Sequence, residues 1–257
     1  MEVHRTAIIH PKAKLADSVS IGPYSIIGEH VVIKENTCIG AHCCIEGYTT
    51  IGLRNKVFTG AVIGSPPQDL KFKGERSFIE IGDDNTIREY VTINPGTAKD
   101  EKTVIGNNNL LMAYSHIAHN CLVGNNIIIA NGGTLAGHVT IEDKAIIGGL
   151  VAIHQFTRIG KLSIIGGCSK VVQDIPPFST CDGHPARIYG LNSTGLKRDG
   201  VSREDRLALK KVFKILFFSD LSLSGAISQA KKEFSKCELV SYLIDFIKKS
   251  KRGIAKK

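Results

Sequence analysis

The chain has 257 residues, of which 42% are hydrophobic, and a formal net charge of +9 at pH 7. This length is sufficient for one large domain or two unequal ones. No basic-then-apolar signal pattern begins the chain, and no uncharged apolar run approaches the roughly 18 residues of a membrane helix, so neither a signal peptide nor an integral membrane segment is expected. Seven cysteines without framework spacing indicate reduced thiols in a cytoplasmic protein.

The excess positive charge is confined to the C-terminal quarter of the chain. Residues 1–196 contain 17 basic and 17 acidic residues, whereas residues 197–257 contain 16 basic and 7 acidic ones. Such a segment can contact nucleic acid, an anionic membrane, an acidic partner protein or a phosphate-bearing substrate. Nucleic acid is the least expected of these partners, because no aromatic residues are interleaved with the basic ones in a groove-like pattern.

Most of the chain follows a six-residue repeat with an aliphatic residue at one fixed position. The repeat starts at Val3, is interrupted after Ile63 and again after Ile93, and ends at Val171, with 26 aliphatic residues in register. A period of six fits neither a helix of 3.6 residues per turn nor strands joined by ordinary turns. It is typical of a parallel β-helix, in which each hexad forms one flat side of a coil and its aliphatic residue points inward.

The two interruptions, predicted at residues 64–80 and 94–104, are expected to be loops ejected from the coil. They exceed the regular spacing by 12 and 6 residues. Long loops on a rigid scaffold often carry function, and the first loop contains the polar residues Gln68, Asp69 and Lys71. We therefore expect this loop to belong to a site.

The repeat fades after its last aliphatic residue, and helical patterns follow. Ser202 can cap a helix with two acidic residues in its first turn. Two further amphipathic segments lie near 222–235 and 237–250. We predict a β-helix over residues 1–190 and an α-helical domain over residues 191–257, which would cover the end of the coil.

The longest uninterrupted run of the repeat contains four histidines. With three hexads in each coil, residues 18 apart in sequence stack about 4.8 Å apart. This spacing places His119, Gly137 and Gln155 in one row, and it brings all four histidines to one short arc of the coil. The four histidines are His116, His119, His138 and His154.

Two chemistries fit such an arc. A neutral histidine can take a proton from a hydroxyl group as that group attacks a thioester, and the N–H of Gly137 can stabilise the oxyanion that develops. Alternatively, three histidines from adjacent coils can bind Zn²⁺ with an open position, as in a zinc-dependent hydrolyase. The residues alone leave both alternatives open.

Six segments carry a more specific signal: PPQDLKFKGE, NNLLMAYSHIAHNC, LAGHVTIEDKAIIGG, AIHQFTRIG, GGCSKVVQDIPP and GLKRDGVSRE. Together they resemble the UDP-N-acetylglucosamine O-acyltransferase family over nearly the whole chain. The resemblance implies a left-handed parallel β-helix followed by a small C-terminal α-helical domain. It also implies transfer of an (R)-3-hydroxyacyl chain from acyl carrier protein to the 3-position of UDP-N-acetylglucosamine, the first step of lipid A biosynthesis.

The same resemblance implies the assembly and the partners. The family is cytoplasmic and homotrimeric, with sites between subunits. It uses no cofactor and no metal, because acyl carrier protein supplies the phosphopantetheine thioester. This carrier is strongly acidic, so the basic C-terminal segment would attract it.

Residue roles follow from the resemblance in the same way. His119 is implied as the general base and Gly137 as the oxyanion donor. Asp69 and Lys71 are implied to bind substrate across a subunit boundary. The remaining residues implied in substrate binding are Gln68, His116, His138, His154, Gln155, Asn192 and Arg198.

Two further positions concern specificity. Gly167 matches the family's position for acyl-chain length, and Lys170 replaces a usual glycine nearby, which predicts a chain of about 12 carbons in place of about 14. Asn120 stands where the family usually has an aspartate, so a carboxylate beside the base is expected to be missing. An amine needs less help from a base than a hydroxyl group does, so the 3-amino analogue of UDP-N-acetylglucosamine is an alternative acceptor.

Overall fold

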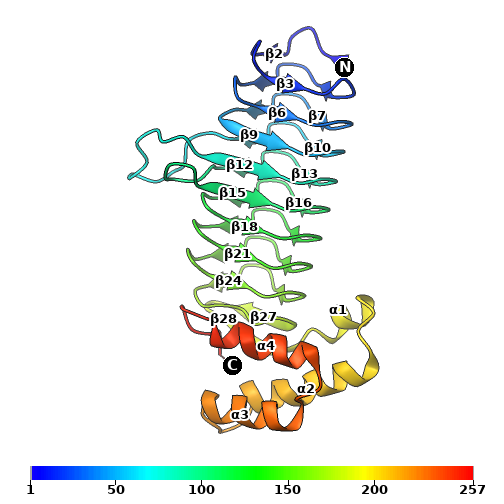
Figure 1. The fold of residues 1–257 in the computed structure, drawn as a ribbon, viewed down its shortest axis with the longest axis vertical. Coiled ribbons are helices and arrows are strands. Elements are labelled where there is room, and N and C mark those ends of the chain that lie inside the picture. Colours follow the sequence, from blue (N-terminus) through cyan, green and yellow to red (C-terminus); the bar gives the residue numbers. More distant parts are fainter. Residues whose placement is uncertain (1, 257) are drawn as a thin grey trace.

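The structure is a computed structural model that describes residues 2–256. The chain winds into a prism with three flat sides, each a sheet of short parallel strands, and a helical domain covers its C-terminal end (Figure 1). The coils advance in a left-handed sense (Figure 1). The predicted left-handed parallel β-helix with a small C-terminal α-helical domain is therefore confirmed.

The three sheets are numbered in the order in which the chain first enters them. The first sheet contains β1 (Glu2–Val3), β4 (Ser20–Ile21), β7 (Cys38–Ile39), β10 (Lys56–Val57), β13 (Thr86–Ile87), β16 (Leu110–Leu111), β19 (Ile128–Ile129), β22 (Ile146–Ile147), β25 (Ile164–Ile165), β27 (Ser179–Gly183) and β28 (Ala186–Leu191). The second sheet contains β2 (Ile8–Ile9), β5 (Ile26–Ile27), β8 (Cys44–Ile45), β11 (Val62–Ile63), β14 (Thr92–Ile93), β17 (His116–Ile117), β20 (Thr134–Leu135), β23 (Ala152–Ile153) and β26 (Lys170–Val171). The third sheet contains β3 (Lys14–Leu15), β6 (Val32–Ile33), β9 (Tyr48–Ile51), β12 (Phe78–Ile81), β15 (Lys102–Ile105), β18 (Leu122–Val123), β21 (Thr140–Ile141) and β24 (Arg158–Ile159).

The register between coils is the one that the repeat predicts. Thr134 pairs with His116, which stands one regular coil earlier in the sequence, and with Ala152, which stands one regular coil later. Where the loops interrupt the coil, Phe78 pairs instead with Tyr48 on the preceding coil and with Lys102 on the following one. The interruptions therefore lengthen two coils without disturbing how the coils stack.

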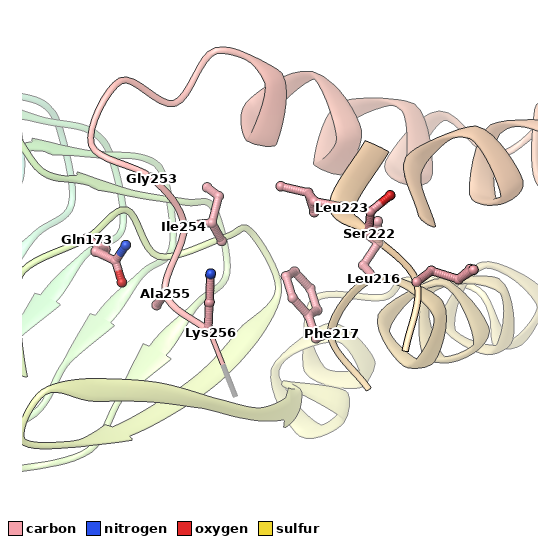
Figure 2. Close-up of a pocket in the computed structure, with 10 residues that line it drawn as sticks. Gln173, Leu216, Phe217, Ser222, Leu223, Gly253, Ile254, Ala255 and Lys256 are labelled. Carbon is pink, nitrogen blue, oxygen red and sulfur yellow. The ribbon is translucent and has the colours of Figure 1, made fainter. Parts of the chain in front are cut away.

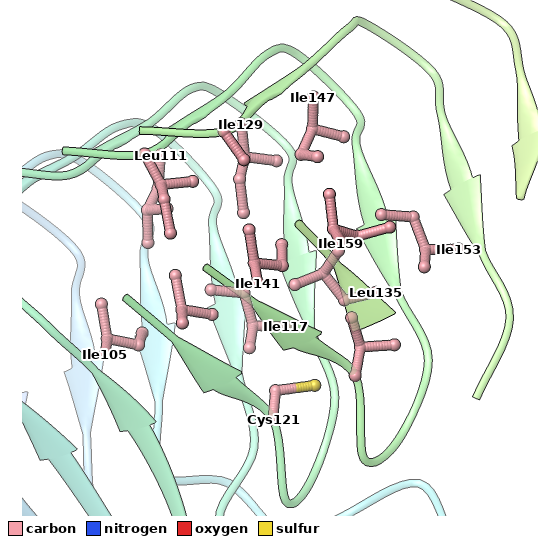
Figure 3. Close-up of a cluster of buried hydrophobic side chains, with 14 of the residues drawn as sticks. Ile105, Leu111, Ile117, Cys121, Ile129, Leu135, Ile141, Ile147, Ile153 and Ile159 are labelled. Carbon is pink, nitrogen blue, oxygen red and sulfur yellow. The ribbon is translucent and has the colours of Figure 1, made fainter. Parts of the chain in front are cut away.

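The aliphatic residue of each hexad lies inside the prism. Ile117, Leu135 and Ile153 form one stack on the second sheet and are at most 3% exposed, and equivalent residues of the other sheets fill the space beside them (Figure 3). Burying each such side chain contributes about 1.5–3 kcal/mol relative to leaving it in water. The repeat seen in the sequence is thus the core of the prism.

The sheets meet at three edges of different composition. We call the turns from the second to the third sheet the histidine edge, because they carry His119 and His138. The turns from the first to the second sheet form the aromatic edge, on which the exposed large hydrophobic residues are Tyr24, Tyr90, Tyr114 and Leu150. The turns from the third to the first sheet form the polar edge, with the amide and carboxylate side chains of Asp83, Asn107, Asn125 and Asp143.

Both ejected loops are shorter than predicted. They occupy residues 64–77 and 94–101, whereas the sequence placed their ends at 80 and 104. The physical reason is that the strands β9, β12 and β15 are longer than the other strands of the third sheet, so pairing with the neighbouring coil begins earlier in the chain.

The prism ends in an antiparallel hairpin of β27 and β28, and β28 continues to Leu191, just beyond the predicted boundary. The helical domain contains α1 (Ser193–Arg198), α2 (Arg203–Phe217), α3 (Leu223–Glu233) and α4 (Glu238–Lys248). The Ser202 side chain accepts from the N–H of Asp205, as predicted for the helix cap, whereas the short helix α1 was not predicted. Among residues 2–256, no helix is both long enough and apolar enough to cross a membrane.

Candidate active site

The histidine edge gathers the polar residues that the sequence singled out. The loops between β11 and β12 and between β14 and β15 leave the prism at this edge, on the left in Figure 1. The turns that carry His119 and His138 follow on the next two coils of the same edge. Loops and histidines therefore lie beside one another because the insertions occur at the same corner of the coil.

The His119 imidazole has a different partner at each nitrogen. Its Nδ1 lies 2.9 Å from Oδ1 of Asn120, and its Nε2 lies 3.8 Å from Oδ2 of Asp69 on the first loop. The His119 side chain is only 14% exposed, so both neighbours act on it with little screening by water. A substrate hydroxyl group could approach Nε2 from the side of Asp69.

The hydrogen bonds of Asn120 fix the direction of its amide group. Its Oδ1 accepts from the backbone N–H of Thr97 at 3.2 Å and from the Thr97 hydroxyl at 3.1 Å. Its Nδ2 donates to Oε2 of Glu101 at 2.7 Å. A backbone N–H can only donate and a carboxylate can only accept, so the oxygen must face His119. The proton of neutral His119 then lies on Nδ1, and the lone pair lies on Nε2.

This network corrects one expectation. The sequence predicted that a carboxylate near the base would be missing, because Asn120 stands in place of an aspartate. In the structure, the Glu101 carboxylate contacts the Asn120 amide on the side away from His119, so the amide lies between the carboxylate and the imidazole. Glu101 and Thr97 were both missed because they belong to the second loop, where the repeat is interrupted. Glu101 nevertheless precedes His119 in the sequence by the length of one regular coil, so the coil spacing could have found it.

Gly137 lies directly against the Nε2 side of the imidazole. A Cβ atom built on Gly137 would lie so close to Nε2 and Cε1 of His119 that any other residue would overlap the ring. The N–H of Gly137 donates no hydrogen bond to other groups of residues 2–256. Gly137 therefore packs against the imidazole and keeps its N–H unused, and an oxyanion site requires such a free donor.

His138 and His116 flank His119. The His138 ring meets the His119 ring edge-on with centroids 5.2 Å apart and stacks on Phe156 at 4.6 Å. Burial lowers the pKa of His138 and nearby His119 lowers it further, while Glu101 and Asp69 oppose this. Burial likewise lowers the pKa of His116, again with a smaller effect from His119. Both flanking histidines are therefore held in the neutral form at neutral pH.

The predicted row continues on the next coil. The N–H of His138 donates to the carbonyl of His119 at 3.0 Å, and the N–H of Phe156 donates to the carbonyl of Gly137 at 3.1 Å. These bonds stack Gln155 beyond Gly137, as predicted. Both His154 and Gln155 are exposed, and the structure places them at the open end of the row, away from the loops.

The first loop approaches His119 of its own chain. Asp69 lies near His119 of the same chain and accepts from the backbone N–H of Lys71 at 2.9 Å, while Gln68 and Lys71 are exposed. The resemblance implied that Asp69 and Lys71 reach across a subunit boundary. Within one chain Asp69 already lies beside His119, and the binding of substrate by Asp69 and Lys71 across a subunit boundary stays a prediction.

Asn192 and Arg198 lie elsewhere. The Asn192 side chain accepts from the N–H of Gly195 and donates to the carbonyl of Leu162, so it caps α1 and fastens it to the prism. An ion pair between Lys144 and Asp199 holds the other end of α1 at the polar edge. In Figure 1, α1 lies on the side opposite the loops. One chain therefore does not bring Asn192 and Arg198 to His119.

The two positions assigned to chain length lie on and beside the second sheet. Lys170 pairs with Ala152 and is the last of a line of outward-facing positions on the second sheet that passes through His116. Three strand spacings, about 14 Å, separate His116 from Lys170. Gly167 is exposed in the turn before β26, next to the carbonyl of Gly149.

Two other features bear on ligand binding. Within residues 2–256, no three His, Cys, Asp or Glu side chains come together in a group that could hold a metal ion. A cavity of about 650 Å³ lies between the C-terminal tail and helices α2 and α3, lined mainly by apolar side chains such as Leu216, Phe217 and Ile254 (Figure 2). Gln173 also lines it and follows β26, three strands beyond β17 in the second sheet, so the cavity is remote from His119.

Comparisons with known proteins decide the family. Residues 174–255 match the family model for UDP-N-acetylglucosamine O-acyltransferase, domain 2, and residues 102–137 match the bacterial transferase hexapeptide model. The chain is 54% identical over 256 residues to the acyl-[acyl-carrier-protein]–UDP-N-acetylglucosamine O-acyltransferase of Thermodesulfovibrio yellowstonii, with 99% of each chain covered. The chain belongs to the UDP-N-acetylglucosamine O-acyltransferase family.

Other members of this family agree in sequence and structure. The enzyme of the same name from Herminiimonas arsenicoxydans is 49% identical over 257 residues, with 98% of each chain covered. The crystal structure of UDP-N-acetylglucosamine O-acyltransferase from Moraxella catarrhalis superimposes with a TM-score of 0.96 at 42% identity and full coverage of both chains. These matches extend over prism and helical domain alike and favour acyl transfer over the zinc hydrolyase alternative.

Proposed function

We propose that this protein transfers an (R)-3-hydroxyacyl chain from acyl carrier protein to the 3-position oxygen of UDP-N-acetylglucosamine, the first step of lipid A biosynthesis. Membership of the family and the donor and acceptor named in its relatives support this proposal. The observation that carries it is the state of His119, whose Nε2 lone pair faces Asp69 and lies against Gly137.

The first step joins the two substrates. Nε2 of His119 takes the proton of the sugar's 3-hydroxyl group while its oxygen attacks the thioester carbonyl carbon. The carbonyl oxygen becomes an oxyanion and is stabilised by the unused N–H of Gly137. The imidazolium that forms keeps its Nδ1–H bond to Asn120, behind which lies the negative charge of Glu101.

The second step releases the carrier. The tetrahedral intermediate collapses, its carbon–sulfur bond breaks, and the thiolate of the phosphopantetheine arm takes the proton held on Nε2 of His119. An ester and a free thiol result, and the base returns to its starting state. All of the protons move between substrate atoms and His119, so this sequence of steps calls on no cofactor and no metal.

The remaining site residues are proposed to bind substrates. Asp69 can accept from a sugar hydroxyl group beside Nε2, and Gln68 and Lys71 extend this loop surface. His138 presents a neutral ring next to the base. Gln155 and His154 lie one coil further towards the helical domain, on the side where the acyl chain is proposed to lie. His116 donates to or accepts from the Thr92 hydroxyl at 2.7 Å, which leaves its other ring nitrogen for the substrate.

We propose a homotrimer in which each site is shared by two chains. Asn192 and Arg198 stand at the polar edge, whereas His119 stands at the histidine edge, so the two groups meet only if these edges face one another in neighbouring subunits. The exposed residues Tyr24, Tyr114 and Leu150 of the aromatic edge, each 59–68% exposed, supply an apolar surface for such packing.

The acyl chain is proposed to lie along the outer face of the second sheet. From His116 the line passes the small side chains of Thr134 and Ala152 before it reaches Lys170. An extended chain of 12 carbons has 11 bonds of about 1.2 Å projection each, about 13 Å in total. This length matches the roughly 14 Å of three strand spacings. Lys170 together with Gly167 would then set a limit of about 12 carbons.

Acyl carrier protein is the proposed donor and partner. The helical domain contains all of the excess positive charge of the chain, with 16 basic residues against 7 acidic ones in residues 197–257. An acidic carrier would be attracted to this domain and oriented by it. We propose that the reaction takes place in the cytoplasm, where carrier and nucleotide sugar are both dissolved.

A mass-spectrometric assay tests the proposal. The protein is incubated with UDP-N-acetylglucosamine, or its 3-amino analogue, and a ladder of 3-hydroxyacyl carrier proteins. We expect an ester product from UDP-N-acetylglucosamine with a maximum near 12 carbons, and none from His119→Ala. A preference for the amino sugar would instead assign amide formation. Failure of every pair, together with stoichiometric zinc and activity lost to chelators, would support the hydrolyase alternative.

A further inference from the structure

We propose that Glu101 is a positioning residue for the base: through the Asn120 amide it holds His119 in the tautomer with its proton on Nδ1. The inference rests on the proposed function, in which His119 is the base. It goes further by naming a residue that does not touch the substrate but determines whether Nε2 can accept a proton.

The geometry of Glu101 suits this task. Its Oε2 accepts from Nδ2 of Asn120 at 2.7 Å and from the backbone N–H of Ala98 at 3.1 Å. The hydrogen bond from Asn120, and then those from the backbone of Ala98 and Thr97, lower the pKa of Glu101. The carboxylate is therefore ionised at neutral pH and can only accept.

The amide needs such a partner because both of its ends can reach His119. If the Asn120 group were reversed, its NH₂ would face the N–H of Thr97, which is also a donor. It would also face Nδ1 of His119, which could then only accept. The histidine proton would move to Nε2, and the atom that must take the substrate's proton would no longer be basic. The bond to Glu101 is the shortest that Asn120 makes and opposes this reversal.

Asn120 and Glu101 also depend on each other. An aspartate at position 120 would place a second carboxylate about 2.7 Å from Glu101, a distance at which two carboxylates share one proton. With asparagine at 120, the negative charge stands behind the amide. The chain thus keeps a charge near the developing imidazolium while it avoids a repulsive pair.

This dependence makes a double-mutant cycle the sharpest test. Glu101→Ala removes the acceptor, and kcat should fall about tenfold to a hundredfold with little change in KM. Glu101→Gln keeps an acceptor oxygen and should lose no more than about threefold. Asn120→Asp alone should lose about tenfold, because its carboxylate faces Glu101. Adding Glu101→Gln to Asn120→Asp should then raise activity, since the glutamine NH₂ can donate to Asp.

The pH profile separates positioning from support of the loop. In the Asn120→Asp, Glu101→Gln variant a carboxylate adjoins the imidazolium, so the acidic limb of kcat/KM should move to higher pH. Asp100→Asn is the matched control. Asp100 neighbours Glu101, lies on the same loop and pairs with Arg76, but it is 51% exposed and does not contact Asn120. This control should leave kcat and the acidic limb unchanged.

A readout without catalysis separates failure of this proposal from failure of the proposed function. The imidazole ¹⁵N shifts of His119, assigned by their loss in His119→Gln, should report Nδ1–H in the wild type and a mixture of tautomers in Glu101→Ala. If no acyl transfer is found but the tautomer responds, the positioning role stands and the function fails. An unchanged tautomer in Glu101→Ala would overturn the proposal. So would a change in activity on Glu101→Gln that has the same sign in the wild type and in Asn120→Asp.

Discussion

The polar edge and the histidine edge are built from the same kind of turn. They differ in what the backbone N–H of the second residue after the strand does. At the polar edge, the N–H of Asn125 donates to Oδ1 of Asp143 at 2.7 Å, and that of Asn107 donates to Oδ1 of Asn125 at 2.8 Å. Each side chain thus caps the turn one coil earlier. At the histidine edge the corresponding residue is Gly137, and its N–H has no such cap within residues 2–256.

The difference shows how one repeat can carry both structure and chemistry. Capped N–H groups stabilise the turn and have no capacity left for a ligand. An uncapped N–H beside a basic nitrogen weakens the turn slightly but offers a hydrogen bond where negative charge develops. The capped turns of Asn107 and Asn125 leave no donor free, whereas the histidine edge leaves the N–H of Gly137 unused.

The largest effect should come from the base itself. His119→Ala removes the proton acceptor, so kcat should fall about a thousandfold or more while KM for the nucleotide sugar changes little. Steady-state kinetics measures both constants. His10→Ala is the control, because His10 lies on the same edge near the N-terminal end of the prism. An equal loss of kcat in His119→Ala and His10→Ala would contradict the assignment of His119 as the base.

A smaller effect is expected at the far end of the acyl line. Lys170→Gly should shift the preferred chain from about 12 towards about 14 carbons and leave the total rate within a few fold. Competition among 3-hydroxyacyl carriers, read by mass spectrometry, gives the preference directly. Lys56→Gly, an exposed strand position on the first sheet, should leave it unchanged. An unaltered preference in Lys170→Gly would remove this residue from the specificity of the reaction.

The smallest effect concerns pH and stability. The pKa of His116 is lowered in the folded state by burial, so below the ordinary value of about 6.5 the unfolded chain binds more protons than the folded one. Stability should therefore fall as the pH decreases from 7 to 5. Thermal unfolding of wild type and His116→Gln over this range measures the contribution, and the loss should be smaller in the variant. A steeper loss in His116→Gln would contradict the stated cause.

Much of this site followed from spacing alone. The regular coil length placed His119, Gly137 and Gln155 in one row because every coil of an uninterrupted prism has the same number of residues. The core and the cap at Ser202 followed from patterning for the same reason, since each depends only on neighbouring residues or on the repeat.

Other features needed the structure because they depend on how side chains meet. Glu101 was hidden by the interruption before it, although its separation from His119 is one coil. The amide of Asn192 is used to cap α1, which no sequence pattern revealed. The folding of Asp69 back onto its own chain depends on the path of the first loop, which has no repeat to define it.

The comparison between edges is tested most directly at one turn position. The rate of transfer from a 3-hydroxyacyl carrier to UDP-N-acetylglucosamine is measured for Gly137→Ala and Asn125→Ala, with thermal unfolding as a check. We predict a loss of about a hundredfold or more in kcat for Gly137→Ala, whose methyl group would overlap the His119 ring. Asn125→Ala should keep its rate but lose about 1–2 kcal/mol of stability. Equal rates in the two variants would contradict the account.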